Sequence, residues 1–443
     1  MKRIFYILIL TAVFTAAFTT APAQEKWTLE QCIDYALENN IMIKQYLLNS
    51  TYRENLHEQS KNNRLPGVSA NVNQGFNFGR SINPDNTYEN INSASTGASA
   101  NANVLIWQGG TVNNTIKQRE FELKASLEDF QKAKDDVTLN IASAYLEILF
   151  AKELIKVSES QIEQTRLQLE RTSALADAGR VARGALLELE ALLAREELNL
   201  VNRENTLQIA YLNLAQMLEL DDYSNFEIAV PEMPEIKSQS SLASSAVVFD
   251  RAVQNRPEIR SAAHQLSAAK MQVKIAEGAR MPTLSASAAV YTDYYNSNQV
   301  DFGNFSDQFN DNLRESVGLN LSIPVFSRFN NRTNIANAKL QLQGQELELE
   351  AAKKELRRQI EQAHVNALAA MKRFTANRTA VESMVESFRY VEEKYSAGRV
   401  SPVEYNDAKT NLGIAESDLI QAKYEFIFRS KILDFYNGIP ISL

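Results

Sequence analysis

Two acidic residues near the start of the last predicted helix have a spacing that would suit a pore. Glu404 and Asp407 are three residues apart, which puts both carboxylates on one face of a helix. If that face lined a narrow symmetric pore, the copies of each residue would form acidic rings that attract cations and that divalent ions could bridge. Crowding of like charges would also raise the pKa values of these carboxyl groups, so closure of the pore would depend on pH.

The same segment has a second interpretation, as the start of a helix. Ser401 suits the N-cap position, Pro402 the first helical position and Glu404 the third, which is the pattern of a capping box. Both carboxylates also lie near the positive end of the helix dipole. Glu404 therefore fits a cap and a pore group equally, whereas Asp407 favours the pore because no cap requires it.

No other group of residues predicts catalysis, a cofactor or a metal site. The sequence has one cysteine, and its three histidines lack the close spacings of zinc ligands. It has no P-loop, His-Glu-x-x-His or Gly-x-Ser-x-Gly motif, and Gly109-Gly110 is interpreted as a turn. With 46 basic and 54 acidic residues, the net charge of −8 disfavours a nucleic-acid partner. We therefore expect a protein that is not an enzyme.

The amino terminus predicts export. Lys2 and Arg3 precede an apolar run that ends in small residues, so residues 1–23 are interpreted as a signal peptide. A retained anchor is the alternative, although the apolar run is shorter than the ~20 residues that a membrane-spanning helix needs. Export of a chain with a single cysteine indicates a bacterial envelope protein that packing alone stabilises.

An internal repeat organises the rest of the chain. Leu65-Pro66 matches Met281-Pro282 at a shift of 216 residues, and Ala178-Gly179-Arg180-Val181 matches Ala397-Gly398-Arg399-Val400 at a shift of 219. Loops of unequal length would absorb the three-residue difference. The expected divisions are a first repeat at 24–220, a linker at 221–241 and a second repeat at 242–443.

Each repeat is expected to read helix, two strands, very long helix, glycine turn and last helix. Alternating apolar and polar residues predict the strands, and helix-forming composition predicts the helices. The strands are expected at about 67–79, 94–107, 283–295 and 314–326, the long helices at about 113–176 and 331–396, and the last helices at about 184–219 and 402–437. Pro257 should kink or restart the first helix of the second repeat. Each long helix would reach roughly 97 Å, which is too long for a globular core.

The duplicated pattern resembles the TolC-like outer membrane efflux protein family over essentially the whole mature chain. The resemblance rests on the order, spacing and duplication of several segments, because no single motif is specific. These segments are Trp27 to Asn40, Leu65-Pro66, Met281-Pro282, Ile323-Pro324-Val325-Phe326 and Tyr395-Ser396-Ala397-Gly398-Arg399.

This resemblance implies a fold, an assembly and a function. The fold would be mixed α and β, mainly α, with a TolC-like duplicated helix-strand-strand-long helix-helix repeat. Three chains would form a homotrimer that shares one β-barrel in outer membrane lipid, continued by a long periplasmic α-helical barrel. A periplasmic adaptor, or membrane fusion protein, and an inner-membrane transporter would dock at the helical tips. The trimer would be a passive conduit of a tripartite efflux system, without a cofactor.

The resemblance also implies roles for residues at the helical tips. Glu404 and Asp407 fall where such proteins carry acidic pore residues, and Tyr395 falls where a tyrosine takes part in the closed constriction. A basic residue expected two positions after the glycine is replaced by Val400, which puts the usual gating bridge in doubt. The residues expected to contact the adaptor are Gly179, Arg180, Val181, Gly398, Arg399 and Val400.

Three alternative functions stay open at this point. A type I protein secretion channel would have the same fold. A non-conducting structural coiled-coil protein of the envelope would use the long helices as a stalk, although the strands argue against it. An envelope hydrolase would need a nucleophile and a base, which the sequence does not place together.

Overall fold

The structure is a computed structural model that describes residues 26–82, 86–231, 242–298 and 302–442. The expected signal peptide and the part of the expected linker at 232–241 lie outside the described residues. The chain divides into two compact units, and each unit takes segments from both halves of the sequence. The first unit contains 1–46, 130–256 and 353–443, and the second contains 47–129 and 257–352.

The first unit is helical and surrounds one apolar core. Its elements are α2 (Leu29–Asn39), the larger part of α4 (Thr111–Asp177), α5 (Arg183–Met217), α6 (Ser245–Asn255), the larger part of α9 (Asn330–Ser396) and α10 (Pro402–Tyr436). Leu29, Ile141 and Leu214 bring α2, α4 and α5 together and are fully buried in the core. Tyr145 belongs to this core, and its hydroxyl group donates a hydrogen bond to the carbonyl oxygen of Ala229 at 2.6 Å.

Capping residues and a proline decide where the short helices begin and end. The side chain of Thr28 accepts a hydrogen bond from the backbone of Gln31, and the Gln31 side chain accepts one in return, so a capping box starts α2. Asn40 separates α2 from the next helix, α3 (Ile41–Asn62). Its side-chain oxygen accepts a hydrogen bond from the backbone N–H of Met42 and so caps the start of α3. Pro257 restarts the helix as α7 (Pro257–Gly278), directly after α6.

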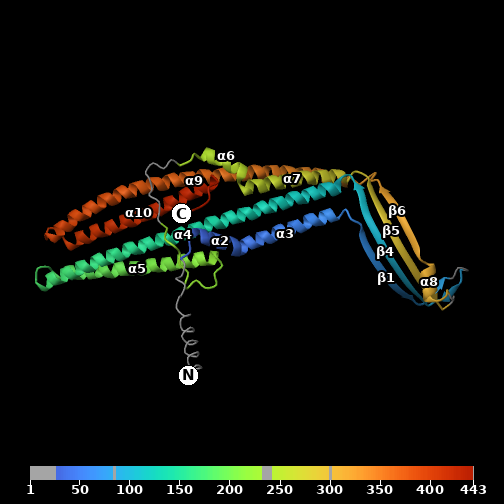
Figure 1. Ribbon diagram of the computed structural model, residues 1–443, viewed down its shortest axis with the longest axis horizontal. Coiled ribbons are helices and arrows are strands. Elements are labelled where there is room, and N and C mark those ends of the chain that lie inside the picture. The colour runs from blue at the N-terminus through green and yellow to red at the C-terminus, as the bar shows by residue number, and fades with distance from the viewer. Residues whose placement is uncertain (1–25, 83–85, 232–241, 299–301, 443) are drawn as a thin grey trace, which may run out of the picture. The chain divides into compact units, whose positions relative to one another are not determined.

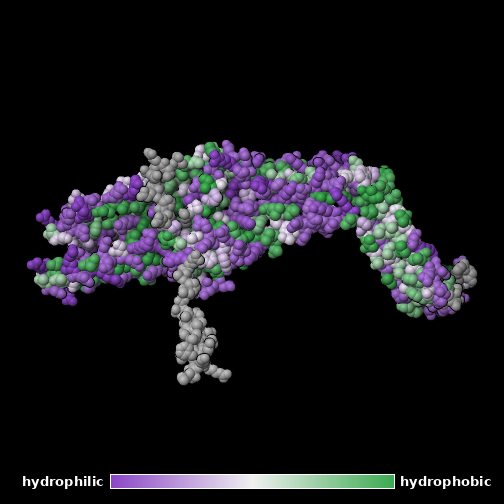
Figure 2. All heavy atoms as spheres, in the orientation of Figure 1, coloured by the Kyte–Doolittle hydropathy of each residue, from purple (hydrophilic) through white to green (hydrophobic). Residues whose placement is uncertain are grey.

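The second unit carries a four-stranded antiparallel sheet whose strands lie side by side in Figure 1. Its strands, in spatial order, are β1 (Gly67–Asn77), β4 (Ser93–Gln108), β5 (Thr283–Ser297) and β6 (Arg314–Ser322). The register pairs Ala70 with Ala100, Ala100 with Val290, and Ala288 with Val317, so apolar residues from all four strands share one face. Figure 2 shows hydrophobic side chains gathered over the end of these strands nearest the helices and mixed with hydrophilic ones farther along.

The ends of several elements differ from the sequence expectations. The strand expected at 67–79 ends at Asn77, before Gly79 at a positive φ of 122°, and the strand expected at 314–326 ends at Ser322. Pro324 explains the second difference, because proline has no N–H for the strand ladder. β5 extends two residues beyond the expected 283–295, and the ends of β4 and of the four long helices shift by at most two residues.

The loops between paired strands contain short elements that the sequence analysis does not predict. These are the hairpin of β2 (Arg80–Ile82) with β3 (Tyr88–Asn90), and the helix α8 (Phe305–Asp311). α8 folds back on β5, where the Thr292 hydroxyl donates to the carbonyl oxygen of Phe309. Within the described part of the chain, no helix is both long enough and apolar enough to cross a membrane.

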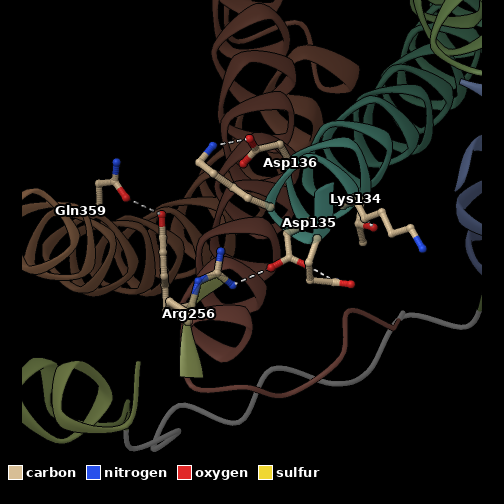
Figure 3. A network of polar contacts seen from close by, with 9 residues as sticks. Lys134, Asp135, Asp136, Arg256 and Gln359 are labelled. Carbon is tan, nitrogen blue, oxygen red and sulfur yellow. Dashed lines mark hydrogen bonds and ion pairs between the residues drawn. The ribbon is translucent and has the colours of Figure 1, made fainter. Parts of the chain in front are cut away.

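Arg256, which directly follows α6, is buried and contacts side chains of α4 and α10. Figure 3 shows the Arg256 side chain, at the end of α6, directed at Asp135 of α4. The guanidinium nitrogen lies 3.1 Å from the carboxylate oxygen, and the two side chains are only 11% and 18% exposed. The guanidinium carbon also lies 4.4 Å from the ring centroid of Phe435, near the end of α10.

Candidate functional site

The two turns that join the long helices to the last helices have the same backbone geometry. Gly179 and Gly398 have φ values of 68° and 69°, in the left-handed region that favours glycine. The next residue bonds back across the turn in each case: the Arg180 N–H donates to the Leu175 oxygen and the Arg399 N–H to the Lys394 oxygen, both at 2.8 Å. Glycine at these positions is therefore explained by the turn itself.

The residues that follow each glycine present polar groups to solvent. Arg180 and Arg399 are exposed, whereas Val181 and Val400 are half-buried. Neither arginine side chain makes a hydrogen bond or ion pair with a described residue. The two tips therefore offer unpaired cations beside partly buried valines, which suits contact with another protein.

The start of α10 is capped by Ser401. Its side chain accepts a hydrogen bond from the backbone N–H of Glu404, at 3.2 Å. The Glu404 carboxylate is exposed and bonds to no described residue, so the cap uses its backbone and leaves its charge available. Asp407 is exposed as well, one turn further along the same helix.

Replacement of Ser401 by alanine should lower the free energy of unfolding by about 1 kcal/mol, because the N–H of Glu404 loses its partner. Chemical denaturation of the purified protein, followed by circular dichroism, would measure this change. Ser401→Asp is the matched control, because an aspartate can also cap. Equal losses in the two variants would contradict the capping role.

Tyr395 is half-buried at the turn end of α9. Its ring stacks on that of Tyr405 with centroids 4.6 Å apart, so it joins the end of α9 to the start of α10. Phe388 packs against the same partner at 5.4 Å. Burial raises the pKa of Tyr405 to about 12, so this hydroxyl stays protonated at neutral pH. Within one chain, Tyr395 therefore fixes the helical hairpin.

A buried charged cluster lies on the next turn of α10. The ammonium group of Lys409 donates to the Gln161 carbonyl oxygen at 2.8 Å and to the Thr165 hydroxyl, and it lies 3.2 Å from a carboxylate oxygen of Glu196. The Lys409 and Glu196 side chains are 5% and 14% exposed. Burial lowers the pKa of Lys409, against the attraction of Glu196. This cluster holds α10 against α4 and α5.

The sequence analysis missed this cluster, although a signal was present. Lys409 is four residues after Tyr405 and four before Gly413, a spacing that puts the three residues on one helix face. Tyr405 is buried, and a Cβ at Gly413 would clash with the side-chain amide nitrogen of Gln161, so this face is closely packed. A lysine on such a face indicates a buried partner.

A polar cavity of about 430 Å³ lies beside this cluster, between α5 and α10. Its lining includes Asp407, Lys409 and Glu196, together with Arg195 and Arg203. Asp407 is therefore an exposed residue beside a charged cavity formed by one chain, a position that the sequence analysis did not foresee. Among the described residues, no group of three or more His, Cys, Asp or Glu side chains could hold a metal ion.

Sequence comparisons give this arrangement a family. The sequence model of the outer membrane efflux proteins matches residues 32–219 and 248–433. The chain is similar to the outer membrane protein TolC of Salmonella enteritidis, with 24% identity over 81% of this chain and 73% of the relative. It is also similar to the outer membrane efflux protein BepC of Brucella suis, with 21% identity over 75% of this chain and 69% of the relative.

Solved structures have the same fold. The CmeC outer membrane channel of Campylobacter jejuni superposes with a TM-score of 0.78 and 18% identity, over 94% of this chain and 87% of that chain. The family model covers most of the present sequence, including both tips and the first residues of α10. The chain therefore belongs to the outer membrane efflux protein family and is an outer membrane channel with a long helical portion in the periplasm.

Proposed function

We propose that the protein acts as a homotrimer, the passive outer membrane conduit of a tripartite efflux system. The sheet of the second unit carries this proposal, because it has one apolar face and its outer strands, β1 and β6, each have one unpaired edge. An open sheet edge is costly in lipid, where no water satisfies the backbone groups. Three copies that pair β1 of one chain with β6 of the next would remove every edge.

We further propose that the six tip residues named above contact a periplasmic adaptor. Their support is the exposed, unpaired Arg180 and Arg399 and the half-buried Val181 and Val400. An inner-membrane transporter would supply the energy, because the sequence has no nucleotide-binding motif. The conduit itself then needs no cofactor.

We propose that Glu404 and Asp407 form acidic rings near the periplasmic end of the conduit, next to the constriction that Tyr395 supports. Planar-bilayer recordings of the purified trimer should show preference for cations and block by divalent cations. Glu404→Gln together with Asp407→Asn should abolish both properties, because the variant keeps the side-chain shapes and removes the charge. Arg180→Gln at the other tip is a matched control and should keep both properties.

The recordings separate the assignment of residues from the function. A variant that conducts with unchanged selectivity and block would contradict the acidic rings and leave the channel intact. Wild-type protein that never conducts would contradict the channel and favour a structural stalk.

Type I protein secretion is a second candidate function. One relative is the alkaline protease secretion protein AprF of Pseudomonas aeruginosa, with 20% identity over 70% of this chain and 63% of the relative. Deletion of the gene should raise sensitivity to small toxic compounds if efflux is the function. Loss of a secreted protein from the medium with unchanged sensitivity would favour secretion.

A further inference from the structure

The loop between β6 and α9 exposes large apolar side chains beside two arginines. Val325, Phe326 and Phe329 are 91%, 72% and 64% exposed, which is unusual for three neighbouring apolar residues of a loop. Together with Arg280, in the turn before β5, and Arg332, in the first turn of α9, they line a cavity of about 480 Å³. All of these residues belong to the second unit.

The arginines of this cavity have no anionic partner in the described chain. Neither Arg280 nor Arg332 makes an ion pair or side-chain hydrogen bond with a described residue, and the cavity lining contains no carboxylate. Residues 316–345 include no Asp or Glu at all, in a chain with 54 acidic residues. The two guanidinium groups of this cavity therefore have no ion-pair partner among the described residues.

The corresponding place in the first half of the sequence is built differently. β1 and β5 begin 216 residues apart, and α4 and α9 begin 219 residues apart, so Arg280 corresponds to Arg64 and Arg332 to Asn113. A guanidinium nitrogen of Arg64 donates to the Asn113 side-chain oxygen at 2.7 Å. In the second half Arg332 takes the place of this acceptor. Arg280 and Arg332 therefore line the same cavity, and neither has a side-chain acceptor there.

The backbone of the loop shows a second difference between the two places. Gly109 and Gly110 have φ values of 54° and 75°, and the corresponding Arg328 and Phe329 have 49° and 64°. Glycine adopts this left-handed conformation without steric cost, whereas a bulky residue such as phenylalanine does so at roughly 1–2 kcal/mol. Backbone strain of this kind is found mainly at functional sites.

A hydrogen bond connects the start of α9, directly after this loop, to the turn that carries Arg280. The Asn331 side chain donates to the carbonyl oxygen of Ala279 at 3.4 Å, next to Arg280. Beyond the cavity, the exposed side chains of Val317, Leu319 and Leu321 continue along the apolar face of β6. A ligand with an anionic head and a long apolar part would match the arginine-lined cavity and the apolar face of β6 beside it.

We propose that this cavity binds a membrane phospholipid, with its phosphate between Arg280 and Arg332 and its acyl chains along the apolar face of β6. Arginine suits phosphate because its guanidinium can donate two parallel hydrogen bonds. Phe326 and Phe329 would lie at the level of the headgroups, where aromatic residues are favoured. The site would hold the end of the sheet at a defined depth in the leaflet nearest the helices.

Native mass spectrometry of the purified full-length protein would test this site by titration with phosphatidylglycerol. Arg280→Gln together with Arg332→Gln should weaken this binding roughly thirtyfold, because each arginine near a lipid surface contributes about fivefold. Arg64→Gln is the matched control, since its guanidinium already has Asn113 as a partner, and it should bind as the wild type does. Arg332→Asn rebuilds the arrangement of the first half and should lose about fivefold.

Two further ligands identify the source of the phosphate. Diacylglycerol lacks the phosphate and glycerol 3-phosphate lacks the chains, so each should bind at least tenfold more weakly than phosphatidylglycerol. Equal binding of diacylglycerol would overturn the role of the arginines, and equal binding of glycerol 3-phosphate would overturn the lipid. Unchanged lipid binding in the double variant and in Arg332→Asn would overturn the site. Bilayer conductance should stay at its wild-type value in both variants, so this result is independent of the channel test.

Discussion

Replacement of Lys409 by methionine should lower the free energy of unfolding by about 3–5 kcal/mol, because it breaks a buried ion pair and leaves one charge without its partner. Glu196 would keep the hydrogen bond from the Thr165 hydroxyl, at 2.5 Å, but would lose the ammonium group. Guanidinium denaturation of the detergent-solubilised protein, followed by circular dichroism, would measure the loss. Methionine preserves most of the volume, so a cavity contributes little.

The double variant Lys409→Met/Glu196→Leu is the control for this prediction. A buried ion pair pays a desolvation cost that often cancels its attraction, so replacement of both charges by apolar groups should recover most of the stability. Double and single variants with equal losses would contradict the ion-pair explanation. They would show that helix packing, and not the unpaired charge, is responsible.

The pH dependence of the Lys409 effect has a definite sign. Because burial lowers the pKa of Lys409 in the folded protein, the folded state releases this proton at a lower pH than the unfolded chain, whose lysine has the usual value of 10.5. The wild type should therefore gain stability over Lys409→Met as the pH rises toward 10.5. A stability difference that stays constant between neutral pH and 10.5 would contradict the direction of this shift.

Local patterns predicted the long elements well and the contacts between them poorly. Alternating residues located β4 to within one residue at each end, because its pattern depends only on neighbouring positions. The sequence analysis expected one helix at the start of the first repeat, whereas the structure has two, α2 and α3, separated at Asn40. A residue whose side chain caps the next helix cannot be told from any other polar helix residue in sequence alone. The Lys409 cluster depends on Glu196, far away in the sequence, and no local pattern contains such a partner.

The candidate site likewise has a part that local sequence predicts, the helix cap, and a part that depends on other chains, the pore. Ser401 could be recognised as a cap because capping involves four consecutive residues, and the structure confirms the hydrogen bond. The pore roles of Glu404 and Asp407 stay predictions, because a ring requires three chains and one chain leaves both carboxylates exposed. Tyr395 has a structural explanation within the chain, through Tyr405, in addition to the constriction that the family resemblance implies.

Arg256→Met should be the second strongly destabilising substitution, again with a loss of about 3–5 kcal/mol. It removes the ion-pair partner of Asp135, whose side chain is 18% exposed, and the cation that packs on Phe435. The guanidinium carbon lies 5.6 Å from the ring centroid of Tyr436 as well, so the last turn of α10 depends on this side chain. Chemical denaturation would give the loss in stability.

Hydrogen exchange distinguishes this role from a general loss of packing. If Arg256 holds the end of α10 in place, Arg256→Met should speed amide exchange at Phe435 and Tyr436 far more than in α5. Arg256→Lys keeps the charge but loses the planar contact with Phe435, so it should give an intermediate effect. Uniform acceleration in all helices would contradict the fastening role, because it would reflect only lower global stability.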